Sequence, residues 1–185
     1  MRCGPAVAPV RASADDGTEQ VTQLLPGEPV DVERRLNGWS LVRTVYGYPG
    51  WVRDGLLVDG AGALVRDRVG EAEVEVARSY LGAPYLWGGM TEQGIDCSGL
   101  VHMAFRRAGG NVPRDAWQQA DAAVPVGELA VGDLIFYGDP VDHVAFWVGG
   151  GRILHATGRE GLGVVEEDEP DALRARPRRT GRLRG

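Results

Sequence analysis

Short hydrophobic runs separated by turn residues characterise the first third of the chain. Runs rich in valine and leucine predict β-strands at residues 21–25, 29–32, 40–45 and 50–52. Between two of these runs, Asn37-Gly38 is typical of a tight hairpin, because both residue types accept positive φ. Several short strands within residues 5–59 predict a small β-barrel, whose closure limits exposed strand edges.

A glycine-rich segment at residues 59–63 interrupts this pattern and marks a domain boundary. We therefore expect a barrel domain at residues 1–59, a linker at 60–68 and a second domain at 69–185. The hydrophobic period then becomes helical over residues 69–81, where apolar residues alternate with glutamate and arginine.

Two further helices are predicted in the second domain. Apolar residues 100–105 follow Cys97 and end before a glycine pair, which predicts a helix with Cys97 at or near its first turn. Pro113 is expected to open a third helix that ends near Ala122, since proline is favoured at the first helical position.

Beyond Pro125 the pattern becomes that of β-strands, predicted at residues 133–137, 143–148, 152–155 and 164–166. Helices followed by a run of strands indicate an α+β domain with an antiparallel sheet. The acidic residues 166–169 are expected to form a solvated turn, and the arginine-rich residues 174–185 a solvated terminus.

Composition and charge narrow the function classes. A hydrophobic content of 43% supports a packed core, and no run of 18 apolar residues is present to form a membrane-spanning helix. The formal net charge is −6, although residues 174–185 carry six arginines and no acidic residue. The rest of the chain therefore carries a larger negative charge than the chain as a whole. It repels phosphate backbones, which argues against a nucleic-acid partner.

The amino-terminal segment bears on localisation. Its apolar run is short and is interrupted by Pro5 and Pro9, unlike the core of a secretory signal. Cys3 also lacks the preceding hydrophobic segment of a lipoprotein. We therefore expect a cytoplasmic protein, with an exported protein whose signal segment is absent from this chain as the alternative. We also expect a monomer.

Cys97 is the most informative residue for chemistry. It follows glycine-rich backbone and begins a predicted helix, where unpaired backbone N–H groups favour an anion. That position is expected to lower the pKa of the thiol from about 8.5 toward the range of reactive cysteines, about 3.5–7.5. The alternative is a small buried hydrophobic residue.

A thiol nucleophile needs a base, and the chain offers three histidines and no lysine. His143 begins one predicted strand and His155 ends the next, after a triple-glycine turn. Antiparallel pairing can bring the start of one strand beside the end of the next. One histidine can then take the Cys97 proton, while the second fixes the tautomer of the first. His102 points away from that helical face and is expected to be a surface or packing residue. A zinc site built from Cys97, His143 and His155 lacks the usual close ligand spacing.

Five motifs in order closely resemble the NlpC/p60 family, at residues 84–89, 96–101, 112–114, 132–137 and 142–145. The family comprises papain-like cysteine peptidases that cut bacterial cell-wall peptides, and the resemblance covers residues 69–165. It implies a papain-like α+β fold in which Cys97 is the nucleophile, His143 the base and His155 the orienting residue. Tyr85 matches the tyrosine that lines the oxyanion site, and no cofactor is implied.

The barrel region resembles a bacterial SH3 (SH3b) domain, chiefly through Gly38-Trp39 and residues 46–52. In family members with this fusion the barrel narrows the groove and selects a free N-terminal L-alanine. The resemblance therefore implies cleavage of the γ-D-glutamyl–diaminopimelate bond of muropeptides, in murein peptide recycling. A blind groove excludes long polymers and so favours released peptides over intact wall.

The resemblance also implies residues that bind this substrate. Tyr48 and Asp115 match positions that hold the substrate amine, and Glu28 is a candidate second carboxylate. An ammonium in a closed groove needs such partners, because a buried unpaired charge is costly. Further groove-lining positions are matched by Asp96, Ser98 and Arg114.

Two other functions remain open. The same residues would serve an amidase or acyltransferase that acts on another cell-wall or lipid substrate. A non-catalytic wall-binding module is the third possibility, although the intact set of Cys97, His143 and His155 disfavours it.

Overall fold

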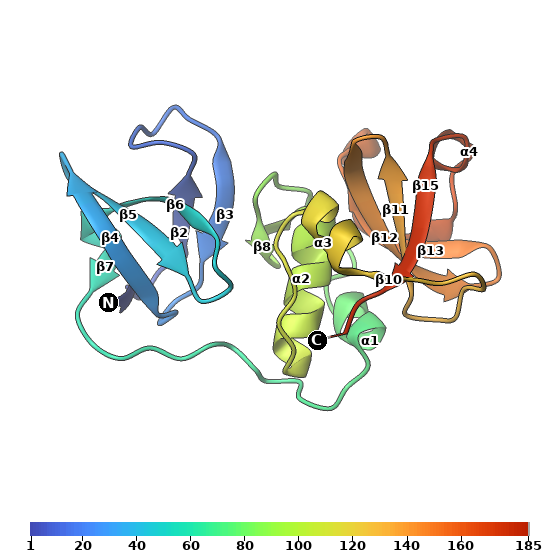
Figure 1. The fold of residues 1–185 in the computed structure, drawn as a ribbon, viewed down its shortest axis with the longest axis horizontal. Coiled ribbons are helices and arrows are strands. Elements are labelled where there is room, and N and C mark those ends of the chain that lie inside the picture. Colours follow the sequence, from blue (N-terminus) through green and yellow to red (C-terminus); the bar gives the residue numbers. More distant parts are fainter. Residues whose placement is uncertain (185) are drawn as a thin grey trace. The chain divides into compact units, whose positions relative to one another are not determined.

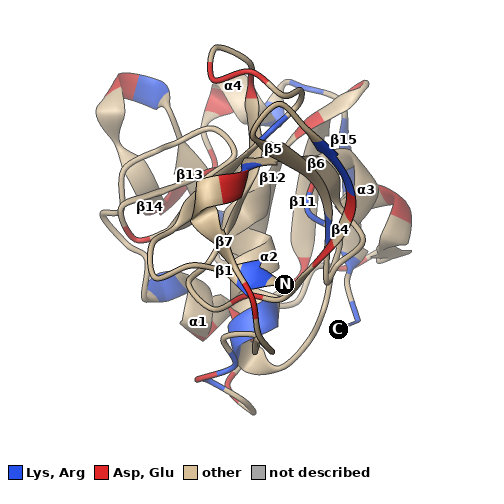
Figure 2. Ribbon diagram, turned by 90° about the vertical axis from the view of Figure 1, so that its left-hand side faces the viewer, with Lys and Arg blue, Asp and Glu red and all other residues tan. Residues whose placement is uncertain are grey.

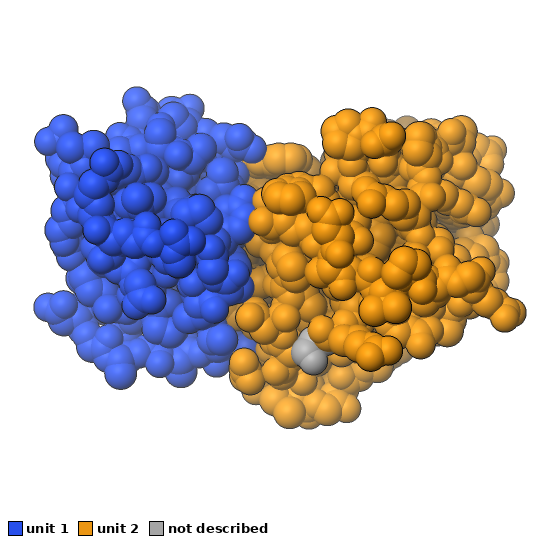
Figure 3. Space-filling view, viewed as in Figure 1, with its two compact units in different colours: residues 1–65 blue, residues 66–185 orange. Residues whose placement is uncertain are grey.

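Two units make up the chain, residues 1–65 and residues 66–185, in a computed structural model that describes residues 1–184. Figure 1 shows their ribbons, and Figure 3 colours the first unit blue and the second orange. The first unit consists of strands and a single short 3-10 helix, η1 (Asp54–Leu56). The second combines helices with a larger sheet, which is the predicted α+β class.

A five-stranded antiparallel sheet in the order β3-β2-β6-β5-β4 forms the first unit, with a second pair β1-β7. The strands are β1 (Arg2–Cys3), β2 (Ala8–Arg11), β3 (Gln20–Leu24), β4 (Val30–Leu36), β5 (Trp39–Thr44), β6 (Pro49–Arg53) and β7 (Leu57–Val58). Their apolar positions meet in one core, which includes Val10, Leu24, Val42 and Val52.

The predicted hairpin is confirmed. Leu36 pairs with Trp39, and the two residues between them, Asn37 and Gly38, have φ of 49° and 82°. Both values lie in the left-handed region that a tight two-residue turn requires. All four predicted strands are present, whereas β1, β2 and β7 were missed because they are short or carry proline within the run.

In the second unit, a six-stranded antiparallel sheet has the order β10-β15-β11-β12-β13-β14, with a separate pair β8-β9. Its strands are β8 (Met90–Thr91), β9 (Gly94–Ile95), β10 (Val124–Pro125), β11 (Leu134–Gly138), β12 (Val141–Gly149), β13 (Arg152–Thr157), β14 (Gly163–Asp168) and β15 (Arg178–Arg182). The helical segments are α1 (Glu73–Arg78), α2 (Cys97–Ala108), α3 (Ala116–Ala122), η2 (Arg159–Gly161) and α4 (Asp171–Arg174). No helix in the described part of the chain is both long and apolar enough to cross a membrane.

Helix α2 packs on strands β12 and β13, and helices α1 and α3 contact α2 (Figure 1). Successive strand residues alternate between the two faces of the sheet. On one face Ile135, Ala145 and Ile153 pack in a cluster with Leu173 of α4. Their neighbours along the strands are equally buried and lie on the opposite face, where α2 packs. The sheet is therefore covered on both faces, which makes it a rigid support for the side chains that its strands carry.

The arginine-rich end is not a solvated terminus. Residues 178–182 form β15, which pairs with β11 and β10 inside the sheet. Arg182 donates to the buried Asp133 at 2.6 Å and lowers the pKa of that carboxyl, while Arg178 bonds Glu169. Figure 2 shows basic and acidic residues distributed over the ribbon. The expectation failed because the strand is held by backbone pairing and distant ion pairs rather than by an apolar face.

Two other local expectations were wrong. Residues 166–168 belong to strand β14, and Glu169 is buried against the hydroxyl of Tyr137 at 3.0 Å, so this stretch is not a solvated turn. Helix α3 begins at Ala116 rather than at Pro113, because Asp115 is its N-cap and forms a capping box with Gln118.

Candidate active site

Cys97 is the first residue of α2, and the turn that carries it is fixed by its neighbours. Asp96 is the N-cap and accepts a hydrogen bond from the Gly99 backbone N–H at 2.6 Å. A Cβ at position 99 would lie 2.4 Å from the Gly89 carbonyl oxygen and 2.8 Å from Asp96 Oδ1. Only glycine therefore allows the preceding loop to approach the helix N-terminus this closely.

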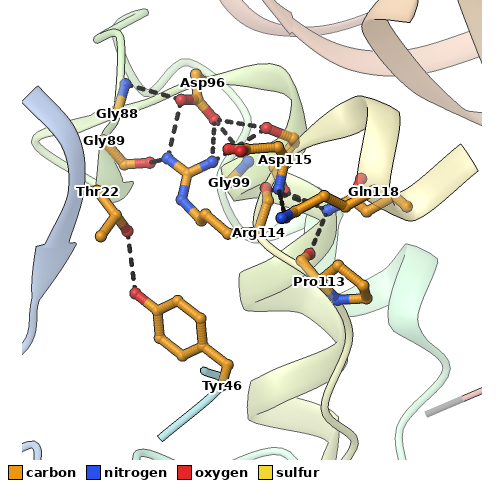
Figure 4. Close-up of polar contacts among 12 residues, drawn as sticks. Thr22, Tyr46, Gly88, Gly89, Asp96, Gly99, Pro113, Arg114, Asp115 and Gln118 are labelled. Carbon is orange, nitrogen blue, oxygen red and sulfur yellow. Dashed lines mark hydrogen bonds and ion pairs between the residues drawn. The ribbon is translucent and has the colours of Figure 1, made fainter. Parts of the chain in front are cut away.

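A buried ion pair lies beneath this turn (Figure 4). Arg114 Nη2 donates to Asp96 Oδ2 at 2.8 Å and Nη1 to Oδ1 at 3.0 Å, a bidentate contact of two oppositely charged groups. Nη1 also donates to Ser98 Oγ at 3.0 Å, and Gly88 N–H donates to Asp96 Oδ2 at 2.8 Å.

The structure thus brings together Asp96, Ser98 and Arg114, which the sequence places along the groove. Asp96, Ser98 and Arg114 are only 6%, 6% and 1% exposed. Their mutual contacts tie the loop before Cys97, the helix cap and the segment before α3 into one unit. This arrangement holds the thiol in place, and a direct contact of these residues with substrate stays a prediction.

The pKa of Cys97 is raised to about 12, opposite to the expectation from its helix position. Burial is the main cause and the Asp96 carboxylate adds to it, whereas the backbone N–H groups of Val144 and Ser98 act in the other direction. The expectation failed because transferring a thiolate out of water costs more free energy than the helix N-terminus contributes. Cys97 is therefore a neutral thiol at rest and needs a base when it attacks.

His143 on β12 and His155 on β13 are hydrogen-bonded to each other, as the glycine turn between the strands predicts. His143 Nε2 lies 2.8 Å from His155 Nδ1, and His155 Nε2 lies 3.0 Å from Glu167 Oε1. Burial lowers the pKa of His143 to about 3 and lowers that of His155, so both rings are neutral at pH 7.

The order of these contacts fixes the tautomers. An ionised carboxylate only accepts hydrogen bonds, so His155 Nε2 carries the proton that is donated to Glu167. The other ring nitrogen, His155 Nδ1, then accepts from His143 Nε2–H. His143 Nδ1 is left with its lone pair, which makes it the basic nitrogen of the site. The neighbouring Val144 N–H contacts the Cys97 sulfur, so this base and the thiol belong to one site.

Glu167 is the site residue that sequence reasoning missed. Burial opposes its ionisation, but hydrogen bonds from His155 and Arg159 outweigh that effect and keep the pKa of Glu167 low. The signal was present in strand periodicity: Val165 lies opposite His155, and residue 167 returns to the same face of the sheet. The predicted strand ends at Glu166, one residue before Glu167, whereas β14 continues to Asp168.

Tyr85 lies beside the nucleophile. Burial raises the pKa of its hydroxyl, and the nearby acidic groups of Cys97 and Asp96 raise it further. The group therefore stays a phenol, able to donate a hydrogen bond. Its part in an oxyanion site stays a prediction.

The three residues predicted to hold a substrate amine occupy different settings. Asp115 caps α3, and Tyr48 lies on the first unit with its ring 6.4 Å from that of Tyr46. Glu28, also in the first unit, is fully buried, and its carboxylate accepts from Leu25 N–H at 2.9 Å. Their joint action on one ligand stays a prediction.

The third histidine packs inside the second unit. His102 is fully buried, and its Nδ1 lies 2.8 Å from the Val112 carbonyl oxygen. Of its two expected settings, packing is the one observed. Within residues 1–184, no group of three His, Cys, Asp or Glu side chains is arranged to hold a metal ion.

We expect mild acid to destabilise the second unit. Burial lowers the pKa of His102 and of His143 to about 3 and also lowers that of His155, against about 6.5 in an unfolded chain. Between these values the unfolded chain binds protons that the folded one does not. The free energy of unfolding should therefore fall as the pH drops below about 6.5, by about 1.4 kcal/mol per pH unit for each of His102 and His143.

Urea unfolding at pH 7.5, 6.0 and 5.0, followed by tryptophan fluorescence, measures this loss. A His102→Gln variant serves as a control and should show a shallower dependence on pH. Equal midpoints at pH 7.5 and 5.0 would contradict the neutral state of the three rings.

Sequence profiles of two domain families match the chain. The NlpC/P60 family profile matches residues 82–172, and that of the bacterial dipeptidyl-peptidase SH3 domain matches residues 10–56. A γ-D-glutamyl-L-lysine dipeptidyl-peptidase of Bacillus subtilis is 38% identical over 129 residues, which cover 65% of this chain and 42% of that protein. The chain thus spans less than half the length of the first curated relatives it matches.

Solved structures agree with these profiles. The peptidoglycan hydrolase RipB of Mycobacterium tuberculosis is 30% identical, with a TM-score of 0.53 over 70% of this chain and 76% of its own. An NlpC/P60 family protein from Bacillus cereus is 22% identical, with a TM-score of 0.56 over 99% of this chain and 62% of its own. The predicted fold, a papain-like α+β domain preceded by an SH3-like β-unit, is confirmed.

Proposed function

The chain belongs to the NlpC/P60 family, and on this premise we propose that it is a cysteine peptidase of cell-wall peptides. The observation that carries the proposal is the linked series Glu167, His155 and His143, which leaves one basic nitrogen on the strand beside Cys97. A binding module needs no such series. A peptidase needs it, because a thiol with a raised pKa attacks only when a base removes its proton.

The reaction follows from these groups. His143 Nδ1 takes the Cys97 proton as the sulfur attacks the carbonyl carbon, and the Cys97 backbone N–H with the Tyr85 hydroxyl stabilises the oxyanion. Each such donor is worth about 3 kcal/mol in the transition state. The imidazolium of His143 then protonates the departing amine, which leaves a thioester on Cys97. Water, deprotonated by His143, releases the acid and restores the thiol.

We place the scissile bond after γ-D-glutamate. The Bacillus subtilis relative is named for a γ-D-glutamyl-L-lysine substrate, and residues 10–56 of this chain match the SH3 domain of bacterial dipeptidyl-peptidases. The substrate is a peptide that begins with a free L-alanine, whose ammonium binds the carboxylate of Asp115. Such peptides are products of wall turnover, so the protein acts in their recycling.

The tripeptide L-Ala-γ-D-Glu-meso-diaminopimelate tests this function. We expect the wild-type protein to release L-Ala-D-Glu from it, detected by mass spectrometry, and to cut the N-acetylated tripeptide at least tenfold more slowly. An intact tripeptide, with another cell-wall or lipid amide cleaved instead, would favour an amidase or acyltransferase.

A further inference from the structure

A pocket of about 440 Å³ opens beside the two hydrogen-bonded histidines, within the second unit. Its lining includes His143 and His155, with Trp87 and Leu173 as apolar surfaces. This volume lies within the range of sites that hold a small ligand, roughly 300–1,000 Å³. The pocket is therefore large enough for one amino-acid residue of a peptide.

The position of the pocket identifies which residue enters it, given the proposed peptidase reaction. His143 must deliver a proton to the departing amine, so the residue that carries this amine lies against the histidine. The pocket is lined by this same histidine. It is thus on the leaving-group side of the scissile bond, where the diamino acid of the stem peptide would lie.

Three charged side chains line the pocket, namely Arg159, Arg176 and Asp142. Arg176 donates from Nη2 to Asp142 Oδ1 at 2.5 Å, and Arg159 donates from Nη2 to both oxygens of Glu167 at 2.8 and 2.6 Å. These contacts use one terminal nitrogen of each guanidinium, which has donors on two more. Each guanidinium is thus paired with one carboxylate and keeps N–H donors that a further carboxylate would accept.

We infer that this pocket binds the leaving residue through a carboxylate at the end of its side chain, with Arg159 and Arg176 as the specificity-determining residues. meso-Diaminopimelate carries such a carboxylate, whereas lysine ends in an ammonium alone. The α-carboxylates of the two residues are alike in tripeptides, so the side-chain end makes the difference. Trp87 and Leu173 pack against the methylene groups that both share.

The test compares kcat/KM for L-Ala-γ-D-Glu-meso-diaminopimelate and L-Ala-γ-D-Glu-L-lysine. We expect the wild-type protein to prefer diaminopimelate by about tenfold or more, the effect of one charge-assisted contact. Arg176→Gln should remove most of this preference and free Asp142 to attract the lysine ammonium. Asp142→Asn should act in the opposite direction and increase the preference, which makes it the matched control.

A third substrate, amidated at the side-chain carboxylate of diaminopimelate, needs no variant. The wild-type protein should cut it about tenfold more slowly than the free acid, so the test stands even if Arg176→Gln folds poorly. Equal rates on all three tripeptides, or an unchanged ratio in a folded Arg176→Gln protein, would overturn the pocket assignment and leave the peptidase intact. Failure to cut any of them would overturn the proposed function and the assignment together.

Discussion

Replacement of Cys97 by alanine should abolish hydrolysis of the tripeptide, with a loss in kcat of at least 10⁴-fold. The nucleophile and the two histidines act as a unit, so removal of the nucleophile eliminates nearly all of their rate enhancement. The remaining residues cannot form the thioester intermediate. Fold and stability should change little, since the buried side chain becomes one of similar size and of lower polarity. Mass spectrometry of the products measures the rate, and circular dichroism checks the fold.

The chain provides its own control for this variant. Cys3 is the other cysteine, also buried and unpaired, and it lies in the first unit. Cys3→Ala should keep the wild-type rate, which would assign the thiol-dependent activity to Cys97 alone. Cys97→Ala with wild-type turnover would contradict the peptidase and favour a module that only binds wall peptides.

How far the sequence predicted this site depends on the range of the interactions involved. The Asn37-Gly38 hairpin and the pairing of His143 with His155 were predictable, because turn chemistry and strand alternation act over a few residues. The raised pKa of Cys97 was not, since it results from packing of α2 against β12, far apart along the chain.

Charged residues were the main source of error. Glu167 and the arginines of β15 lie in charged stretches typical of solvated segments, and in β15 no apolar pattern marks a strand. Each is held by partners that lie distant in sequence, such as Asp133 for Arg182. Local sequence patterns therefore identify the nucleophile and the histidines. The charged residues that hold the strands and the site in place, such as Glu167, are identified only by the fold.

The buried pair of Asp96 and Arg114 should have the largest effect on stability. Arg114→Met would leave the Asp96 carboxylate buried without its charged partner, at side-chain exposures of 9% and 1%. Removing one member of a buried ion pair typically costs about 3–5 kcal/mol. Urea unfolding at pH 7.5 should show a loss of this size. The turnover rate should fall as well, because Arg114 bonds both the cap residue and Ser98 next to the nucleophile.

An exposed pair in the same unit is the matched control. Arg68 and Glu71 are 34% and 43% exposed and lie three residues apart, so Arg68→Met should cost less than about 1 kcal/mol. The double variant Asp96→Asn with Arg114→Met removes both charges, and part of the lost stability should return. If Arg114→Met unfolds within 1 kcal/mol of wild type, the pair does not support the turn that holds Cys97. In that case its closeness to the thiol would point to a direct contact with substrate.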